Sequence, residues 1–321
     1  MGAETMVTRK RLFMILRLSV TLIILALLWQ AVDGQAALDL LLRADPLWLV
    51  AGVITLTAQT VLSALRWRLT ANRLGQTIAV GHALREYYLS QIVNQSLPGG
   101  VLGDAGRAVR ARHEAGLKRS GQAVMFERLA GQLALFVVTC LAVAIVWLSP
   151  GGITLPDWVL RLVALTGLAM LVLLGGLWAL SGGTTATQRQ IGDWLSAFRL
   201  AVLSPSVLPR QAMLSIGTTA LNLSAFALCA RATGTVMPVT AVLIVVPLIL
   251  FTMLIPVSIS GWGLREGAAA TLFPVIGATA TEGFAASLAF GLMFLLSTLP
   301  GLLVLLVRQP ADVTKTDSVS G

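Results

Sequence analysis

The sequence predicts an all-α polytopic membrane protein, and three observations support this fold class. Of the 321 residues, 56% are hydrophobic and 12% are charged, and the mean hydropathy is +0.85. Soluble globular domains do not have this composition. Apolar runs of about 18 to 25 residues recur along the chain, and each is long enough to cross the hydrocarbon core of a bilayer. Two further apolar regions are interrupted by proline, glycine and charged residues.

Six apolar runs are continuous enough to form full transmembrane helices. They are Leu12–Val32, Pro46–Leu65, Gln122–Leu148, Trp158–Leu180, Gln211–Ala230 and Gly283–Val307. The first run exceeds the apolar core of a signal peptide, so we expect it to remain as an uncleaved span. Residues Ile191–Leu203 have the apolar spacing of an amphipathic helix, which predicts a helix at the membrane surface.

The two interrupted regions are His82–His113 and Met237–Ala280. Each begins as apolar helix, breaks at proline, glycine or serine, and continues through charged residues into a second helical stretch. This pattern predicts two broken helical hairpins. Each hairpin is either re-entrant or a pair of short crossing helices, and both alternatives return the chain to the side from which it came.

The distribution of basic residues predicts the topology. Lysines and arginines gather at residues 9–11, 66–73, 107–119 and 189–210, while the alternate loops are poor in them. The positive-inside rule then places these clusters and both termini in the cytoplasm. The chain divides into halves of about 1–150 and 151–308, which run in opposite directions and form an inverted repeat within one membrane domain, residues 1–308. Residues 309–321 are polar and predict a disordered cytoplasmic tail.

The two breaks share a local pattern, seen in PGGVLGDAGR and PVSISGWGLR. Arg107 lies nine residues after Pro98, and Arg265 lies nine residues after Pro256. A glycine stands at the fifth position after each proline. These matches support the prediction that the two hairpins correspond to each other.

Breaks of this kind are typical of ligand sites in transporters. Non-helical backbone inside a bilayer is stable only when it is buried in protein or lines a polar cavity. A helix that restarts near Asp104 presents free amides and the positive end of its dipole, which suits a phosphate group. Arg107 can add a bidentate charged partner, and Asp104 can neutralise it at i,i+3 when no ligand is bound. In the second break, Ser258 or Ser260 can cap the restarting helix.

Other polar residues beside the breaks have two interpretations each. Arg265 and Glu266 are charges expected inside the membrane, where charged residues are usually functional. Glu127 and Arg128 either face the cavity or mark a capped helix start. Asn94 either lines the cavity or satisfies freed backbone groups.

The residues exclude several other classes of protein. Cys140 and Cys229 lie inside apolar runs, and we interpret both as packing residues. His82 and His113 lack the spacing of metal ligands, so we expect no metal site and no cofactor. No nucleotide-binding loop or hydrolase motif is complete, and we expect no catalytic residue. The net charge of +9 is better explained by cytoplasmic loops and anionic lipid than by nucleic acid.

Three stretches, NQSLPGGVLGDAGRAVR, AVMFERLAG and IPVSISGWGLREGAA, resemble the flippase-like membrane domain of the lysylphosphatidylglycerol synthases, also known as multiple peptide resistance factor proteins. The resemblance covers nearly the whole chain, as in a stand-alone member that lacks the soluble synthase domain. It implies a bacterial cytoplasmic membrane protein that moves lipids between leaflets. The positions that match the family's motifs are Pro98, Gly99, Gly100, Gly103, Asp104, Arg107, Glu127, Arg128, Pro256, Gly261, Gly263, Arg265 and Glu266.

We therefore expect a lipid translocase, not an enzyme, whose ligand is an anionic or aminoacylated phospholipid or a polyprenyl-linked lipid. Head-group binding is expected at the thirteen motif positions together with Asn94 and Ser258. Two alternatives stay open: a membrane-embedded transferase acting on a lipid phosphate, and a non-transporting partner of a separate lipid-modifying enzyme encoded nearby. Oligomerisation is also left open by the sequence.

Overall fold

The computed structural model describes residues 2–96, 102–113, 115–148, 156–181, 185–255, 258 and 260–306, and no β-strand occurs among them. The N-terminal elements are α1 (Gly2–Ala31), α2 (Gly34–Leu42), α3 (Pro46–Arg73), α4 (Val80–Ser96), α5 (Leu102–Arg110), η1 (Ala111–His113) and α6 (Gly116–Leu148). The C-terminal elements are α7 (Asp157–Ser181), α8 (Ala186–Phe198), η2 (Arg199–Leu203), α9 (Leu208–Ala232), α10 (Val239–Phe251), η3 (Thr252–Leu254), α11 (Leu264–Leu272), η4 (Phe273–Ile276), α12 (Ala280–Ser297) and α13 (Pro300–Leu306).

Four helical stretches are long and apolar enough to cross a membrane. They are Pro46–Arg73, Gly116–Val146, Leu208–Ala232 and Ala280–Leu303. A fifth candidate is the pair Ile15–Ala31 and Gly34–Leu42, which is bent by 94°. The span predicted at Trp158–Leu180 lies within the continuous helix α7, which is not among these candidates. The protein is thus an all-helical, multi-pass membrane protein with four or five candidate spans among the described residues.

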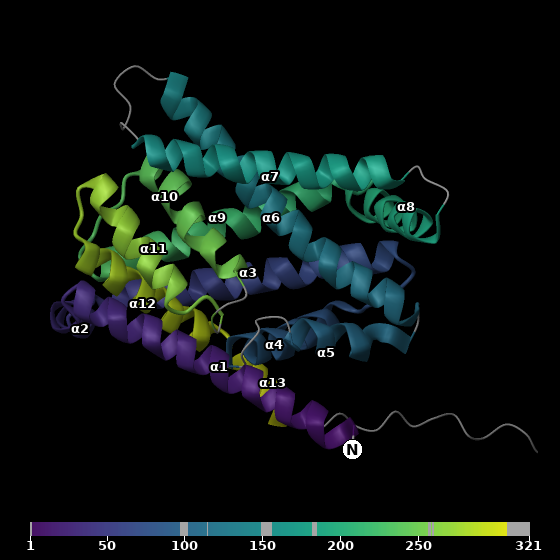
Figure 1. Ribbon diagram of the computed structural model, residues 1–321, viewed down its shortest axis with the longest axis horizontal. Coiled ribbons are helices and arrows are strands. Elements are labelled where there is room, and N and C mark those ends of the chain that lie inside the picture. The colour runs from purple at the N-terminus through teal and green to yellow at the C-terminus, as the bar shows by residue number, and fades with distance from the viewer. Residues whose placement is uncertain are drawn as a thin grey trace, which may run out of the picture.

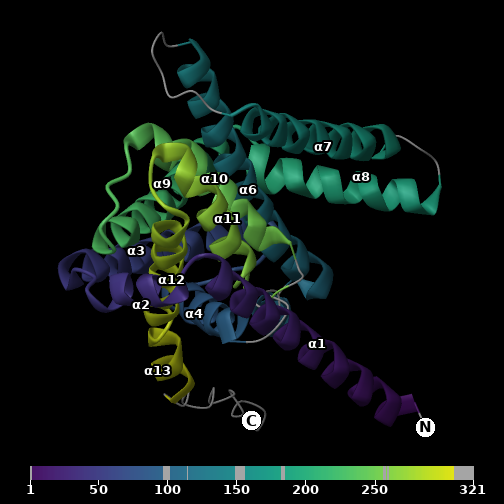
Figure 2. The same ribbon diagram turned by 60° about the vertical axis from the view of Figure 1, so that its left-hand side comes forward.

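Helices α3 and α9 pack side by side through the centre of the bundle (Figures 1 and 2). Both begin with proline in the first turn, where the missing amide has no intrahelical partner to lose. Both end in a glycine with a left-handed backbone, Gly75 at φ 91° and Gly234 at φ 102°. The amide of the residue after each glycine donates to a carbonyl inside the last turn, as in a Schellman motif. Helices α7 and α8 lie against each other at the edge of the bundle.

Each predicted broken region forms a hairpin of two short helices. The first hairpin pairs α4 with α5, of 17 and 9 residues, and the second pairs α10 with α11, of 13 and 9 residues. A full span needs about 20 residues, so neither nine-residue arm can cross the hydrocarbon core. The two hairpins touch, because the Ser260 hydroxyl donates to the Asn94 carbonyl at 2.5 Å.

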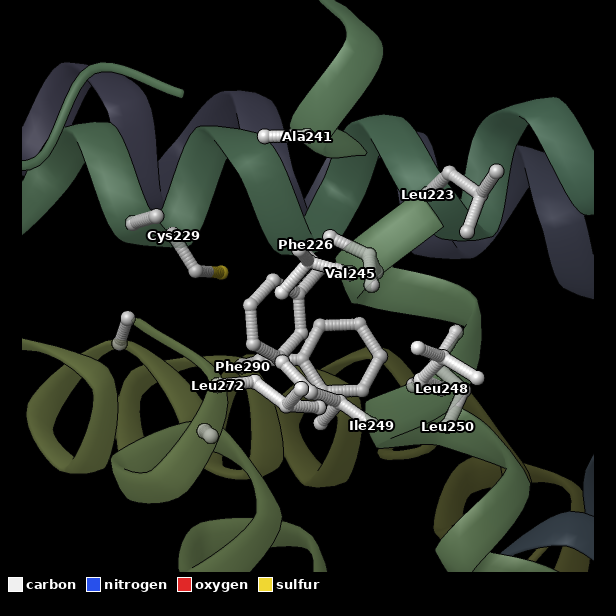
Figure 3. Packing of buried hydrophobic residues seen from close by; sticks show 14 of the residues in the cluster. Leu223, Phe226, Cys229, Ala241, Val245, Leu248, Ile249, Leu250, Leu272 and Phe290 are labelled. Carbon is white, nitrogen blue, oxygen red and sulfur yellow. The ribbon is translucent and has the colours of Figure 1, made fainter. Parts of the chain in front are cut away.

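The largest apolar core holds the second hairpin in place. Phe226 of α9 and Phe290 of α12 lie with ring centroids 5.3 Å apart, and both are fully buried. Figure 3 shows these two rings packed between α9, α10 and α12, with Val245 and Ile249 beside them. Because α10 is apolar on nearly all sides, it is enclosed by its neighbours and not amphipathic.

Candidate head-group site

A cavity of about 260 Å³ lies where the two hairpins meet α3, α6 and α9. Four charged side chains contribute to its wall: Arg66, Asp104, Glu127 and Arg128. Amide side chains add hydrogen-bonding groups, and these are Gln59, Gln91, Asn94, Gln95, Gln132 and Asn222. Such a concentration of polar groups inside a membrane protein indicates a ligand or water pathway.

Arg66 and Glu127 form a buried ion pair on the cavity wall. Arg66 Nη2 lies 2.6 Å from Glu127 Oε1, and their side chains are 7% and 1% exposed. Arg66 Nη1 donates to the Thr218 hydroxyl at 2.9 Å, which ties α3 to α9. The Tyr87 hydroxyl also donates to Glu127 Oε1, at 3.4 Å. Helices α3, α4 and α6 are thereby joined at the Glu127 carboxylate, and α9 is joined to them through Arg66.

Asp104 forms the second ionic centre of the cavity. Its Oδ1 accepts from Ser90 Oγ at 2.7 Å and from Arg107 Nη2 at 3.0 Å. Its Oδ2 is in direct ionic contact with Arg128 Nε. The Arg128 side chain is 47% exposed, so it can reach a ligand more easily than the buried arginines can.

Arg107 is 1% exposed and lies behind the cavity wall. Its guanidinium lies over the rings of Trp67 and Tyr87, 4.6 and 4.5 Å from their centroids. Nη2 also lies 3.4 Å from Glu127 Oε2. Its Nε and Nη1 are buried, and within the described residues they have no hydrogen-bond partner. Nη2 of Arg107 therefore contacts two carboxylates, while Nε and Nη1 form no hydrogen bond within the described residues.

This cluster carries one net positive charge, because three arginines meet two carboxylates. A surplus positive charge in a site that excludes much of the solvent favours an anionic ligand. The cavity amides add neutral groups that can bond to hydroxyl, amine or ester groups of the same ligand. Gln91, for example, is 8% exposed, and its Oε1 has no partner in the described part of the chain.

Part of the cavity lining is apolar. It is formed by Leu135, Leu250, Met253, Leu254, Phe290 and Phe294. Leu254 is 52% exposed, so the apolar wall reaches the outer surface of the protein. The cavity lining therefore combines charged and amide groups with hydrocarbon side chains.

The first hairpin is held together by a close contact at Gly103. The Gly103 amide donates to Asn94 Oδ1 at 2.8 Å, so Asn94 both satisfies freed backbone and lines the cavity. A Cβ atom at Gly103 would lie only 1.9 Å from the Ser90 carbonyl oxygen. Only glycine lets α4 and α5 approach this closely.

Gly103→Ala is expected to destabilise the protein by about 2 kcal/mol, because the added methyl group forces α5 away from α4. Thermal unfolding in detergent measures the effect. Gly81→Ala, in the first turn of α4, is the matched control, since nothing lies within 4 Å of its Cβ position. An equal midpoint for both variants would contradict the proposed close contact.

The second hairpin contains a separate buried ion pair. Arg265 Nη2 lies 2.5 Å from Glu266 Oε1, and both side chains are at most 1% exposed. Glu266 Oε2 accepts from the Gly263 amide at 2.6 Å, and Ser287 bonds to both partners of the pair. Arg265 lies against the rings of Trp262 and Phe290. The pair is behind the cavity wall, with Phe290 between them.

The prediction that Ser258 or Ser260 caps α11 is wrong. The N-cap is Gly263, which has no side chain to cap the helix, and its own amide donates to the Glu266 carboxylate at N3, as in one half of a capping box. Gly261 and Gly263 both have positive φ, so the chain approaches α11 through a turn that side chains disfavour. As a result α11 begins at Leu264, later than a helix capped by Ser258 or Ser260 would begin.

The sequence-derived candidates thus fall into three groups. Those on the cavity wall are Asn94, Asp104, Glu127 and Arg128. Those placed beside it are Gly103, Arg107, Ser258, Gly261, Gly263, Arg265 and Glu266. Pro98, Gly99, Gly100 and Pro256 lie outside the described residues, as does the tail at 309–321.

Sequence reasoning missed Arg66, which it assigned to a cytoplasmic cluster. The signal was a polar face in an otherwise apolar helix: Gln59, Ser63, Arg66 and Thr70 follow one another at helical spacing on α3. Helix α9 carries a matching face with Gln211, Ser215, Thr218 and Asn222. The two faces meet, because Arg66 bonds to Thr218 and Gln211 bonds to Thr70.

The fold and site define a class of protein: a multi-pass helical membrane protein with two broken hairpins around an internal, net positive cavity. Residues 14–301 match the family described as the lysylphosphatidylglycerol synthase TM region. The match spans most of the chain, and the protein belongs to this family. The resemblance noted from the sequence motifs is confirmed. No curated protein matches the chain.

Proposed function

We propose that the protein is a lipid translocase that holds a phosphate-bearing head group in the cavity while the hydrocarbon tails stay in the bilayer. The membership of a family of lipid-related membrane domains supports a lipid as the ligand. The substrate is an anionic or aminoacylated phospholipid or a polyprenyl-linked lipid, and the membrane is the bacterial cytoplasmic membrane. A separate lipid-modifying enzyme would supply it.

The mixed lining of the cavity, charged and amide groups together with hydrocarbon, is the observation that carries this proposal. Its charged wall provides Arg66 and Arg128 as partners for a phosphate, which arginine binds through two parallel hydrogen bonds. Its apolar wall extends to the half-exposed Leu254. A lipid has the same division into an anionic head and a hydrocarbon body, so it can occupy the cavity without burying charge against hydrocarbon.

The proposed mechanism uses two inverted halves with both termini in the cytoplasm. Several features of the halves agree with this arrangement. Helices α3 and α9 both end in a Schellman motif, and each hairpin begins five residues after the terminal glycine, at Val80 and at Val239. Helix α6 packs on α10, and α13 packs on α4. In each hairpin a buried arginine contacts two aromatic rings.

The two hairpins do not place their buried arginines at equivalent helix positions. Arg107 is in the second turn of α5, whereas Arg265 is in the first turn of α11. The shared Pro-to-Arg spacing therefore does not reflect equal positions on the two helices. The repeat that we propose rests on helix order and packing, and the ten-residue motif adds little to it.

Leaflet exchange in liposomes tests the function. The full chain is reconstituted with fluorescent phosphatidylglycerol, lysylphosphatidylglycerol or a polyprenyl-phosphate lipid, and dithionite quenching reports the outer-leaflet fraction with time. We expect at least one of these lipids to exchange faster than fluorescent phosphatidylcholine in the same vesicles. Protein-free liposomes give the background rate.

Exchange at the background rate for all three anionic or aminoacylated probes would contradict translocation. The transferase and the partner roles would then remain, and a mass change of the lipid after incubation would distinguish them. Equal acceleration of every probe, phosphatidylcholine included, would show unselective scrambling and would contradict a head-group site.

A further inference from the structure

The cavity arginines are already neutralised in the structure. Arg66 is bound to Glu127, and Arg128 is bound to Asp104. A phosphate that binds both arginines weakens these two ion pairs, because each guanidinium must then share its hydrogen bonds. A buried carboxylate that loses its cation is strongly destabilised. Anion binding at this cavity therefore requires another partner for Asp104 and Glu127.

Arg107 is placed to be that partner. Its Nη2 lies 3.0 Å from Asp104 and 3.4 Å from Glu127, so it already touches both carboxylates. Its Nε and Nη1 have no hydrogen-bond partner among the described residues, so they are available for additional bonds to the two carboxylates. Cation–π contacts with the rings of Trp67 and Tyr87 help to hold the guanidinium in place.

We infer that Arg107 is a positioning residue. When an anionic head group binds Arg66 and Arg128, Arg107 becomes the main cationic partner of the Asp104 and Glu127 carboxylates. This inference rests on the proposed function. It assigns the direct head-group contacts to the two cavity arginines and gives Arg107 no contact with the ligand. The number of ion pairs in the cluster then stays constant as the ligand enters and leaves.

The exchange of partners also explains why three arginines and two carboxylates occur together. With two arginines alone, each carboxylate would compete directly with the ligand for its only cation. With Arg107 between the carboxylates, the competition is reduced because each carboxylate has a second cation within reach. Asp104 is the group on which this effect is most easily measured, since it contacts both Arg107 and Arg128.

A double-mutant cycle on ligand affinity tests the inference. The full chain in phosphatidylcholine nanodiscs is titrated with dihexanoyl phosphatidylglycerol, and Kd is measured by microscale thermophoresis for the wild type, Arg107→Met, Asp104→Asn and the double variant. We expect Arg107→Met to weaken binding about tenfold in the wild-type background. In the Asp104→Asn background, where one carboxylate needs no cation, we expect a loss of about threefold or less.

Equal losses in the two backgrounds would overturn the inference, since a direct contact or a general charge effect of Arg107 does not depend on Asp104. An unchanged Kd in Arg107→Met, with only a lower unfolding midpoint, would also overturn it. If that variant does not fold, Arg107→Lys replaces it, which keeps the charge and loses the planar donor set. If the wild type binds dihexanoyl phosphatidylglycerol no more tightly than dihexanoyl phosphatidylcholine, both this inference and the head-group site are overturned. If the wild type binds phosphatidylglycerol selectively but the cycle is additive, only the role of Arg107 is overturned.

Discussion

Arg66→Gln is expected to slow leaflet exchange of the preferred lipid about a hundredfold, the size of effect seen when one member of a buried charge pair is truncated. Glutamine keeps much of the side-chain length but removes the charge and the planar donor set. The cluster then has no net charge, and Glu127 keeps only the longer ion pair with Arg107 and the hydrogen bond from Tyr87. The dithionite assay in liposomes measures the rate.

Arg73→Gln is the matched control for this prediction. Arg73 is the last residue of the same helix and is exposed, so the same substitution there removes a positive charge outside the cavity. We expect its exchange rate to stay within about twofold of wild type, since an exposed charge contributes little at a distance. A similar loss in both variants would mean that Arg66 acts only through general charge.

Glu266→Leu is expected to lower the free energy of unfolding by about 3 to 5 kcal/mol, because it leaves the Arg265 guanidinium buried without a counter-charge. The double variant Arg265→Met/Glu266→Leu is expected to recover most of this loss, since a buried ion pair can often be replaced by apolar side chains. Unfolding in mixed micelles measures the free energy of unfolding of both variants.

Glu282→Ala serves as the control for Glu266→Leu. Glu282 belongs to the exposed capping box at the start of α12, and its loss is expected to cost about 1 kcal/mol. If the double variant is no more stable than Glu266→Leu, the pair has another structural role, such as the bond from the Gly263 amide to Glu266. If the double variant is stable but exchanges no lipid, the second hairpin acts directly in transport.

The elements that sequence reasoning identified best are those with strong local signals. The end of the first span at Val32 agrees closely with the end of α1 at Ala31, where Asp33 adopts a left-handed backbone and the chain turns. The breaks of both hairpins were predicted from proline, glycine and serine in apolar surroundings. The i,i+3 pairing of Asp104 with Arg107 was predicted from helical spacing and is present.

The sequence predicts less well which residues line the cavity. Arg66 belongs to a basic cluster that the positive-inside rule places at the cytoplasmic side, and only the tertiary structure shows that its side chain is buried against Glu127 and Thr218. The sequence predicts that Arg107 binds the phosphate, whereas in the structure Arg107 lies against Trp67 and Tyr87 and is 1% exposed, and Arg128 lines the cavity. Which arginine is covered and which lines the cavity depends on contacts between residues far apart in the sequence.

The sequence alone determined the class of the protein: its apolar runs, its basic loops and its broken regions require a helical membrane protein with polar groups inside it. These features are local, since hydropathy, helical period and backbone preference act over one or two turns. Only the tertiary structure decided which charges share a cavity. The side chains of Arg66, Asp104, Glu127 and Arg128 come from three helices, and their pairing follows from how α3, α5 and α6 pack together. Because an ion pair in a low-dielectric interior is sensitive to a change of an ångström, the packing determines the chemistry of the site.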